Sequence, residues 1–534
     1  MPSTVRTPLF GQLCFLRVAG LLLVMATASV WPAHRLVAQD EPAKDSAAVA
    51  LYADAANFQT NGAIGLAVDT WKKFLKEYPS SPLASKASHY LGVCYMQQDT
   101  PDLKAAAEAF KVALEDTKYD LREESLSNRG WCLYAAAGTG EEADPKLLRE
   151  SIATYDTLIK EIPDSRLLDR AYFYRGEAQY TLGKLNEAID SYNAMMKLDD
   201  IASSALRCDA LYARGVALEE QKNFEQAQSS YQQLLEACAD TDLVLDVEIR
   251  LGDMHLLQGE MQQAVKRFES VATNTNATAE DKAYSFFRQG YAYAQDGDPE
   301  QASASYEKLL TQFPQSPYAA AATLASAQTL YQAGDLPGAA ERFRDVLTGT
   351  DPVAATESAH WLARIELGTA NRDPSKTVES AKSAYDVASE QIAKGPQGNF
   401  AVALKLDAAE ALSLQPDRLE EAYEQYESIA NEHSDHPLAP RALYNAAFMT
   451  LQLGNTEQAV KLADSFEAKF ASDPLAPDAM FVGAEALLAS GDASNAAERY
   501  QSLINNNQHR DHPQRSTWIL RGATAWKAAG EPTK

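Results

Sequence analysis

The chain has 534 residues and a formal net charge of −26 at pH 7, from 48 lysines and arginines and 74 aspartates and glutamates. A surface this acidic repels phosphate backbones and anionic membranes, so we expect no nucleic-acid partner. The charge instead favours a basic or neutral protein partner, or serves only to keep the chain soluble.

The first 38 residues predict a secretory signal peptide. Arg6 and Arg17 precede an apolar run, and small residues follow it. Ala26-Thr-Ala28 fits the small-x-small cleavage rule, and Leu36-Val-Ala38 is the other candidate cleavage sequence. Export would place the protein in the periplasm or cell envelope. An uncleaved N-terminal anchor is the alternative, because the apolar run is only slightly shorter than a membrane span. We expect contact with a membrane only if this anchor is retained.

After a short polar linker at 39–46, the chain follows one repeated pattern, which is clearest at 283–322. Apolar residues at three- and four-residue steps predict a first helix, which the Gly-Asp-Pro sequence at 297–299 ends. A second helix follows, with Ala302 and Tyr306 on its apolar face. Two helices of this length cannot bury both of their faces alone, so the unit needs a neighbour on each side.

Both halves of this pattern recur along the chain. A small residue stands at the same point of the first helix at Gly92, Gly130, Gly176, Gly215, Gly252, Gly290, Ala327, Ala447, Ala484 and Gly522. In the second helix, an alanine is followed four residues later by an aromatic residue at Ala188/Tyr192, Ala227/Tyr231, Ala264/Phe268, Ala302/Tyr306, Ala339/Phe343 and Ala496/Tyr500. Small residues let two helices approach closely while the aromatic ring fills the space beside them, so the pattern predicts stacked helix pairs.

The predicted organisation is all-α, with about twelve helix pairs and one final helix. The pairs are predicted at 47–78, 83–118, 121–162, 167–199, 204–239, 242–274, 279–313, 317–349, 352–394, 398–434, 437–471 and 474–507, and the lone helix at 513–530. The predicted domains are 1–38, signal peptide; 39–46, linker; 47–350, regular repeats; 351–434, degenerate repeats; and 435–534, further repeats with the terminal helix. The last helix either caps the array or marks a sequence that stops short of its natural end.

These features resemble the tetratricopeptide repeat (TPR), which has a small residue in helix A, then an alanine and an aromatic residue in helix B, then a proline. The lengthened turns at 78–84, 313–319 and 433–439 look like those of a bacterial envelope subgroup. That subgroup includes the Tol–Pal-associated periplasmic coordinator and the TPR lipoprotein of the outer-membrane β-barrel assembly machine. The resemblance implies a TPR superhelical solenoid that acts as a protein-binding scaffold in envelope assembly or cell-wall processes.

The resemblance also implies a binding surface, because helix A lines the concave groove of TPR solenoids. Transfer of the inward positions predicts groove residues at Trp131, Tyr134, Phe173, Tyr180, Tyr212, Phe287, Tyr291, Tyr331, Tyr444 and Phe448. Lys86, Arg170 and Arg441 fall at a groove position too and suit a partner's carboxylates. Aromatic side chains suit an extended peptide or a helix, although such stripes also arise from packing between units. The alternative function is a periplasmic glycan-binding helical-repeat protein that stacks sugars on the same rings.

Two of the cysteines are predicted to form a disulfide. Cys208 begins the first helix of the fifth pair and Cys238 ends its second helix, and antiparallel packing places these two ends together. Cys94 and Cys132 each follow a helix A glycine by two residues. We expect this second pair of cysteines to be buried as small hydrophobic side chains.

Signatures of catalysis are missing from the sequence. There is no HExxH, no phosphate-binding glycine loop and no Gly-x-Ser-x-Gly elbow. Two His-x-x-His sequences, at 433–436 and 509–512, lack the further ligands that a metal requires. We therefore expect no enzymatic activity, no cofactor and no metal. A helical accessory domain of a wall-cleaving enzyme stays open as a third interpretation, with its catalytic domain elsewhere.

Overall fold

The structure, a computed structural model, describes residues 43–506, 510–531 and 533. The predicted signal peptide, the first part of the predicted linker and His509 lie outside the described residues. The described part consists of twenty-five α-helices and two short 3₁₀ helices, and it contains no strand. The prediction of an all-α fold is therefore confirmed.

The contacts divide the chain into two compact units, unit 1 (Met1–Arg267) and unit 2 (Phe268–Lys534). Unit 1 contains α2 (Ala43–Thr60), α3 (Ile64–Glu77), α4 (Ala84–Met96), α5 (Leu103–Ala113), α6 (Arg122–Ala137), α7 (Pro145–Glu161), α8 (Leu168–Thr181), α9 (Leu185–Met195), α10 (Arg207–Glu220), α11 (Phe224–Ala237) and α12 (Leu243–Leu257), with 3₁₀ helices at Gly140–Glu142 and Ile201–Ser203. Helix α13 (Met261–Thr273) begins in unit 1 and ends in unit 2.

Unit 2 continues the same succession of helices. It contains α14 (Ala279–Gln295), α15 (Pro299–Gln312), α16 (Ala319–Ala333), α17 (Leu336–Leu347), α18 (Pro352–Arg372), α19 (Thr377–Ala393), α20 (Ala401–Ser413), α21 (Leu419–Glu432), α22 (Ala439–Gln452), α23 (Thr456–Phe470), α24 (Ala476–Ala489), α25 (Ala493–Asn505) and α26 (Arg515–Ala528). The stretch 351–434, predicted as degenerate repeats, forms the two pairs α18–α19 and α20–α21.

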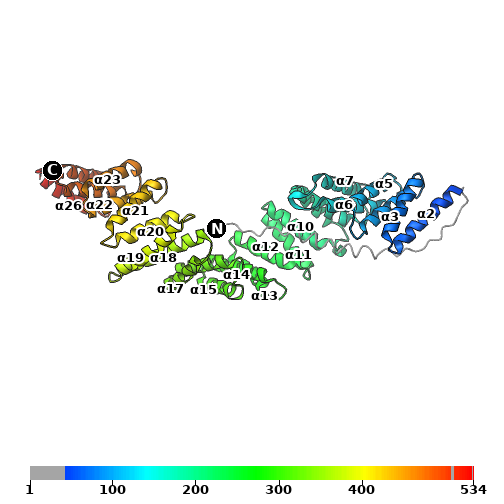
Figure 1. The fold of residues 1–534 in the computed structure, drawn as a ribbon, viewed down its shortest axis with the longest axis horizontal. Coiled ribbons are helices and arrows are strands. Elements are labelled where there is room, and N and C mark those ends of the chain that lie inside the picture. Colours follow the sequence, from blue (N-terminus) through cyan, green and yellow to red (C-terminus); the bar gives the residue numbers. More distant parts are fainter. Residues whose placement is uncertain (1–42, 507–509, 532, 534) are drawn as a thin grey trace. The chain divides into compact units, whose positions relative to one another are not determined.

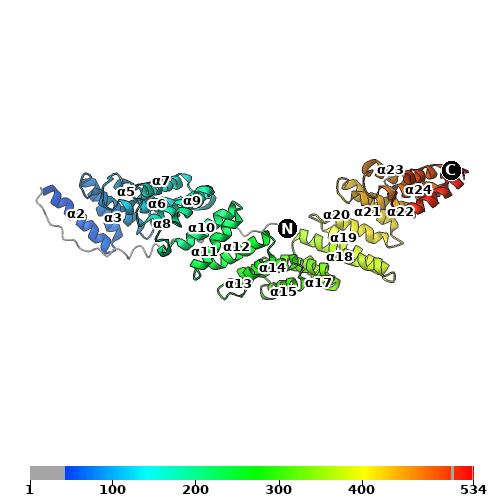
Figure 2. The ribbon, with the colours of Figure 1, turned by 180° about the vertical axis from the view of Figure 1, so that it is seen from behind.

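Consecutive helices form pairs, as Figures 1 and 2 show from opposite sides. We call the even-numbered helix of each pair helix A and the odd-numbered helix that follows it helix B. Within each unit, a helix packs mainly against the helix before it and the helix after it, which is the arrangement of a solenoid. Each predicted pair encloses the observed one, except that α2 begins at Ala43, inside the predicted linker.

The turn between helix A and helix B is built as its residues dictate. Gly297 has a φ of 81°, a left-handed conformation that glycine adopts without steric cost. Asp298 then caps α15 by accepting a hydrogen bond of 3.0 Å from the amide of Gln301, and Pro299 occupies the first turn. The same capping bond, in which an aspartate or asparagine side chain accepts from the amide three residues later, occurs at Asp102, Asn223, Asp335, Asn455 and Asp492.

Within a pair, an aromatic ring of helix B lies over a glycine of helix A. This contact occurs between Gly92 and Phe110, Gly130 and Tyr155, Gly176 and Tyr192, Gly215 and Tyr231, and Gly290 and Tyr306. All five rings are buried. The repeated small residue and the repeated aromatic residue of the sequence pattern are therefore one packing contact, which sets the distance between the two helices.

An arginine ties several pairs to the pair before it. In α10, Arg214 lies directly before Gly215, and its Nε donates to Ser230 Oγ of α11 at 2.8 Å. Its Nη1 donates to Asn193 Oδ1 of α9, the preceding helix B, at 3.4 Å. One guanidinium thus joins three helices of two successive repeats.

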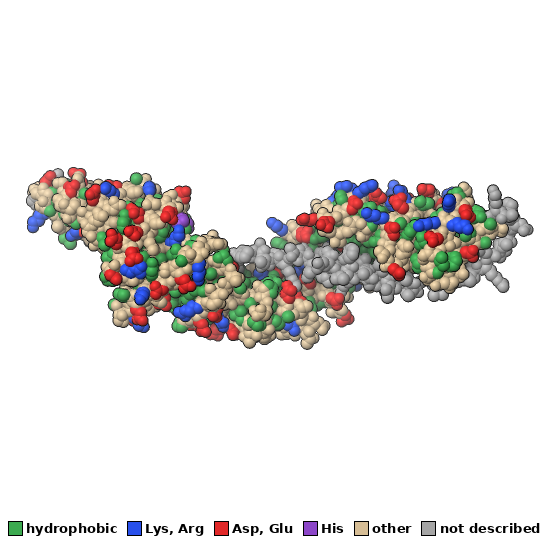
Figure 3. Space-filling model, in the orientation of Figure 1, with side chains coloured by type: hydrophobic (Ala, Val, Ile, Leu, Met, Phe, Trp, Pro, Cys, Tyr) green, Lys and Arg blue, Asp and Glu red, His purple; other side chains and the backbone are tan. Residues whose placement is uncertain are grey.

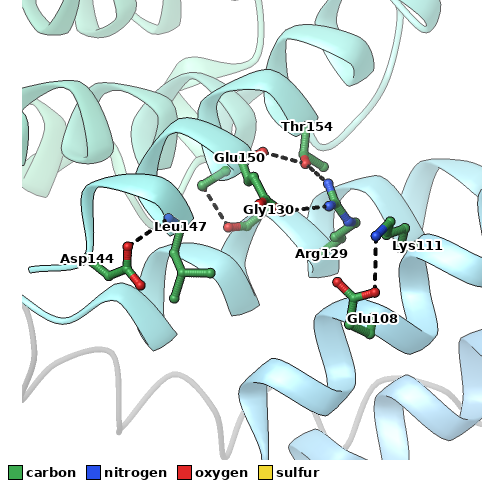
Figure 4. A network of polar contacts seen from close by, with 9 residues as sticks. Glu108, Lys111, Arg129, Gly130, Asp144, Leu147, Glu150 and Thr154 are labelled. Carbon is green, nitrogen blue, oxygen red and sulfur yellow. Dashed lines mark hydrogen bonds and ion pairs between the residues drawn. The ribbon is translucent and has the colours of Figure 1, made fainter.

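Arg129 of α6 occupies the same position, directly before Gly130, and Figure 4 shows it in the space between α6 and α7. Its guanidinium donates to Thr154 Oγ1 and, at 3.3 Å, to Glu150 Oε2 of α7. In the same figure Lys111 of α5 is bonded to Glu108 of its own helix.

In other repeats the arginine comes from helix B. Arg267 of α13 donates from Nη1 to Glu248 Oε2 of α12 at 3.1 Å and from Nη2 to Gln232 Oε1 of α11 at 3.4 Å. The same bridge to the preceding helix B is made by Arg342 to Glu307 and by Arg499 to Asp464 and Glu467. Where helix A carries the arginine, as at Arg214, helix B has Ser230; where helix B carries it, as at Arg267, helix A has Leu251. In each of these repeats the arginine therefore occupies only one of the two corresponding positions.

Candidate partner-binding surface

Four of the ten aromatic side chains predicted to line a groove are buried in unit 1. The exposed fractions are 5 % for Trp131, 8 % for Tyr134, 2 % for Phe173 and 4 % for Tyr212. Neighbouring pairs stack so closely in unit 1 that these side chains fill the space between them. They are not available to a partner, so the predicted groove does not extend over these four positions.

Polar contacts explain why the tyrosines of unit 1 are held inside. The hydroxyl of Tyr212 on α10 donates to Asp246 Oδ2 of α12 at 2.6 Å, and Arg250 Nε donates to the same oxygen at 2.7 Å. Burial and the nearby Asp246 carboxylate raise the pKa of Tyr212 above its ordinary value, so the hydroxyl remains a donor. Tyr180 of α8 is half-buried, and its hydroxyl donates to Glu220 of α10.

The five predicted positions in unit 2 keep part of their surface in solvent. Phe287, Tyr291, Tyr331 and Tyr444 are half-buried, and Phe448 is 37 % exposed. Apart from Tyr180, the accessible members of the predicted set therefore all belong to unit 2.

Three further aromatic side chains extend this surface across α16, α18 and the start of α20. The ring centroids of Tyr331 and Trp361 are 4.9 Å apart, those of Trp361 and Phe400 are 5.8 Å apart, and those of His360 and Phe400 are 5.0 Å apart. All four side chains are half-buried. Sequence reasoning missed Trp361, His360 and Phe400, because the small residue used to assign the register of helix A is not recognisable in these two repeats.

A carboxylate at the centre of this region joins three successive A helices. Glu410 of α20 accepts hydrogen bonds of 2.9 Å on Oε2 from Arg364 Nη1 of α18 and from Arg441 Nη2 of α22. Arg364 is half-buried, and Arg441 keeps 45 % of its side chain exposed. Two guanidinium groups share one carboxylate here, and each guanidinium has five N–H donors, more than these contacts use.

A second, buried carboxylate lies one turn away on α20. Asp407 is held by His360 Nδ1 at 2.5 Å and lies 3.6 Å from Arg364 Nη1. Burial raises the pKa of Asp407, whereas His360 and Arg364 oppose that rise. These contacts hold α18 against α20, and so they also hold Trp361 and Arg364 of α18 in place beside α20.

On α22, Tyr444 and Phe448 form a stacked pair one turn beyond Arg441. Their ring centroids are 6.4 Å apart with an interplanar angle of 17°. We define the unit 2 helix A surface as Tyr331, Trp361, Arg364, Phe400, Arg441, Tyr444 and Phe448. Its members follow one another along α16, α18, α20 and α22 through the ring contacts and the two ion pairs to Glu410.

The two remaining predicted cations belong to unit 1. Lys86 forms an ion pair of 2.8 Å with Asp120, and Arg170 is half-buried in unit 1. Figure 3 shows charged side chains of both signs scattered among apolar ones on the face in view. Basic side chains thus have acidic neighbours over much of that face.

Cys208 and Cys238 are joined by a disulfide whose Cα atoms are 6.0 Å apart. The bond links the start of α10 to the end of α11, the two ends that the sequence placed together. Cys94 and Cys132 are free and buried, and burial raises the pKa of the Cys94 thiol to about 12. Both thiols therefore behave as small apolar side chains.

The described residues contain no group of three or more His, Cys, Asp or Glu side chains arranged to hold a metal ion. Within the same residues, no helix combines the length and the apolar content that crossing a membrane requires.

Three segments of the chain match family models. Residues 272–436 match a tetratricopeptide repeat-like domain, and residues 209–241 and 450–513 match tetratricopeptide repeats. The chain contains tetratricopeptide repeats. The fold, in which a small residue of helix A meets an aromatic residue of helix B in successive pairs, is accordingly that of a TPR-like solenoid.

Solved TPR structures are similar to parts of the chain. The C-terminal part of a TPR repeat-containing protein from Cytophaga hutchinsonii is 17 % identical over 52 % of this chain and 98 % of its own, with a TM-score of 0.39. A TPR protein from Parabacteroides merdae is 16 % identical over 53 % of this chain and 99 % of its own, with a TM-score of 0.33. YrrB, described as a TPR protein with an unusual peptide-binding site, is 19 % identical over 43 % of this chain and 100 % of its own, with a TM-score of 0.31. No curated protein matches the chain.

Proposed function

We propose that this TPR protein is a non-catalytic scaffold that binds a segment of a partner protein on the unit 2 helix A surface. One observation carries the proposal: the tyrosine, tryptophan and arginine side chains of the unit 2 helix A surface keep part of their surface in solvent, whereas four of the five aromatic side chains predicted to line a groove in unit 1 are buried. These three residue types dominate the binding energy of protein interfaces, because each brings a large contact area or several donors. The half-buried rings are already held in place, so little entropy is lost on binding.

The order of groups along the surface suits an extended or helical segment. Aromatic rings lie at one end on α16 and α18, two arginines lie in the middle, and the Tyr444–Phe448 stack lies at the other end. A bound segment would place apolar side chains against the two aromatic groups and polar or acidic groups near Arg364 and Arg441.

We further propose that the protein acts in the periplasm or cell envelope. The predicted signal peptide and the Cys208–Cys238 disulfide support this location, because disulfides persist in oxidising compartments. A role in envelope assembly or cell-wall processes rests on the resemblance to the Tol–Pal coordinator and outer-membrane assembly subgroup.

Site-specific crosslinking in cells tests the proposal. A photoreactive amino acid replaces Phe448 in the full chain, and a matched control replaces Leu257, an apolar side chain of unit 1 that is 64 % exposed. We expect a discrete protein to be crosslinked at position 448 and not at position 257. Tyr444→Ala, combined with crosslinking from position 331, should weaken capture of the same protein.

Two outcomes would redirect the proposal. Equal capture at positions 448 and 257 would remove the unit 2 helix A surface as the binding site. Recovery of cell-wall glycan at position 448 would instead favour the glycan-binding alternative, in which the stacked rings of Tyr444 and Phe448 hold sugars.

A further inference from the structure

Unit 2 also has a recess, which lies outside the unit 2 helix A surface. It is a hollow of about 510 Å³ between helix α15 and the C-terminal end of α16. It is lined by Pro299, Glu300, Ser303, Ala304 and Glu307 of α15, by Leu330 and Ala333 of α16, and by Asp335 at the start of α17. We call it the α15–α16 notch.

At two positions of the notch, small residues stand where larger residues meet in another repeat. In unit 1, Gln228 of α11 donates to the side chain of Gln258, after α12, at 2.9 Å, so two long side chains meet there. Gln228 follows the repeated alanine of helix B by one residue, as Ser303 does; Gln258 follows the small residue of helix A by six, as Ala333 does. Serine and alanine are too short to meet, so the space between them stays open.

The residues at the position of Ser303 in two other repeats support this explanation. The residue that corresponds to Ser303 is Ile189 in α9 and Val265 in α13, and both are buried. A β-branched apolar side chain therefore fills this position in those repeats. Ser303 and its exposed neighbour Ala304 leave the outer face of α15 without such a side chain.

The lining of the notch has an apolar floor and an acidic rim. Leu330, Ala304 and Ala333 supply apolar surface, and three carboxylates surround it. Glu307 is paired with Arg342. Glu300 is exposed and forms no hydrogen bond or ion pair with any residue that the structure describes.

The third carboxylate is bonded to a backbone amide, which is uncharged and so does not balance its negative charge. Asp335 accepts a hydrogen bond of 3.1 Å from the amide of Gly338, which is the cap of α17. Three acidic side chains thus face one arginine, in a chain whose net charge is −26. An anionic or purely apolar ligand is disfavoured here, whereas a cationic group gains charge-assisted hydrogen bonds.

We propose that the α15–α16 notch receives a lysine or arginine side chain of a partner protein, together with an adjacent apolar side chain. The aliphatic stem of the basic residue covers Leu330 and Ala333, and its charged end lies at Glu300. A volume of about 510 Å³ accommodates these two side chains and excludes a folded domain. The notch is a docking site for a short basic segment and is independent of the partner bound on the unit 2 helix A surface.

Selection of peptides on the full chain tests this proposal. Random 12-residue peptides displayed on phage are selected on the immobilised wild-type protein, and enriched sequences are synthesised and their Kd values measured. We expect one enriched class to contain a lysine or arginine next to an apolar residue and to lose affinity as salt is raised. Failure to enrich such a class would overturn the proposal.

Two variants locate the binding of this class. Ser303→Gln combined with Ala333→Gln reproduces the Gln228–Gln258 pair and closes the notch, and it should raise Kd at least tenfold. Glu300→Gln keeps the shape and removes one charge, and it should raise Kd about three- to tenfold. Because Glu300 is exposed, this variant reports on binding even if the double variant fails to fold.

Matched controls separate this proposal from the scaffold function. Glu225→Gln, at the equivalent position of α11, should leave the Kd unchanged. Tyr444→Ala with Phe448→Ala should also leave it unchanged, whereas peptides that bind the unit 2 helix A surface should be lost. Basic peptides that bind the Ser303→Gln/Ala333→Gln variant with unchanged Kd would overturn the notch while leaving the scaffold proposal intact.

Discussion

The ring of Tyr231 lies directly against Gly215: a Cβ built on Gly215 would be 2.3 Å from Cε1 of the ring. The ring cannot move aside, because it is fully buried and its hydroxyl donates to Glu219 Oε2 at 2.9 Å. Helices α10 and α11 therefore approach to a distance that only glycine permits. This relationship is the physical content of the glycine and tyrosine spacing in the sequence.

Gly215→Ala is expected to destabilise the fifth pair by about 1–3 kcal/mol, the usual effect of inserting a methyl group into a filled core. The measurement is hydrogen exchange of α10 and α11, which reports the local free energy of opening in an array whose global unfolding is not two-state. Gly65→Ala is the control, since nothing lies within 4 Å of its added Cβ, and it should be neutral or slightly stabilising. Similar effects at the two positions would contradict the close approach.

The arginine contacts predict that the guanidinium can be moved from helix A to helix B of the same pair. Arg214→Leu removes the donor to Ser230 and Asn193 and should cost about 1–3 kcal/mol of local stability, because partly buried acceptors lose their partner. Adding Ser230→Arg recreates the arrangement of the next repeat, where Leu251 and Arg267 occupy the two corresponding positions, and should recover at least half of the loss.

An exposed arginine serves as the control for these two variants. Arg166→Leu removes an ion pair with Glu124 from a side chain that is 76 % exposed, and it should change stability by less than about 0.5 kcal/mol. A double variant at 214 and 230 that is less stable than Arg214→Leu alone would show that the two positions are not equivalent places for the guanidinium.

The fold followed from the sequence because each repeat contains its own turn chemistry and its own packing contact. Gly297 and Asp298 mark where one helix ends and the next begins, and Tyr306 identifies the residue that fills the pair. These are local signals, and so the predicted pairs agree with the observed helices even in 351–434, where the glycine is absent. The periodic aromatic positions of helix A, by comparison, do not predict how closely the next repeat will stack.

The exposure of the candidate site residues depends on how closely adjacent repeats stack, which one repeat of the sequence does not determine. Trp131 and Phe448 occupy the same position after the small residue of helix A, yet Trp131 is buried and Phe448 is exposed. Their different exposure comes from the neighbours on the adjacent A helices, which the register of one helix cannot reveal. Glu410 joins Arg364 and Arg441 for the same reason: three separate repeats must stack before these groups meet.

Removal of the disulfide is expected to weaken the fifth pair. Cys208→Ser with Cys238→Ser should lower its stability by about 3–4 kcal/mol, because the bond closes a sequence separation of 30 residues in the unfolded chain. The readout is hydrogen exchange of α10 and α11 with and without a reducing agent. The reduced wild type should match the double variant, and the double variant should not respond to the reducing agent. A wild type that is equally protected when reduced would contradict a stabilising role for the bond.

His89 predicts a pH dependence that is confined to the start of the array. The side chain is 5 % exposed in α4, its Nδ1 lies 2.7 Å from Ser125 Oγ, and burial lowers its pKa to about 4. In the unfolded chain the pKa is about 6.5. As the pH falls from about 6.5 towards 4, the unfolded state binds a proton that the folded state does not, so stability is lost across this window and the loss is complete below pH 4.

At pH 5 the loss due to His89 should be about 2 kcal/mol relative to pH 7.5, from 1.36 kcal/mol for each unit of difference in pKa. Hydrogen exchange of α4, corrected for the intrinsic pH dependence of exchange, measures it in the wild type and in His89→Gln. Glutamine does not titrate, so the variant should lose the extra opening at pH 5 even though its stability at pH 7.5 is lower. His433→Gln, a substitution in unit 2, should leave the pH response of α4 as in the wild type. If His89→Gln retained the wild-type pH response, carboxylates and not the buried imidazole would govern the acid sensitivity of α4.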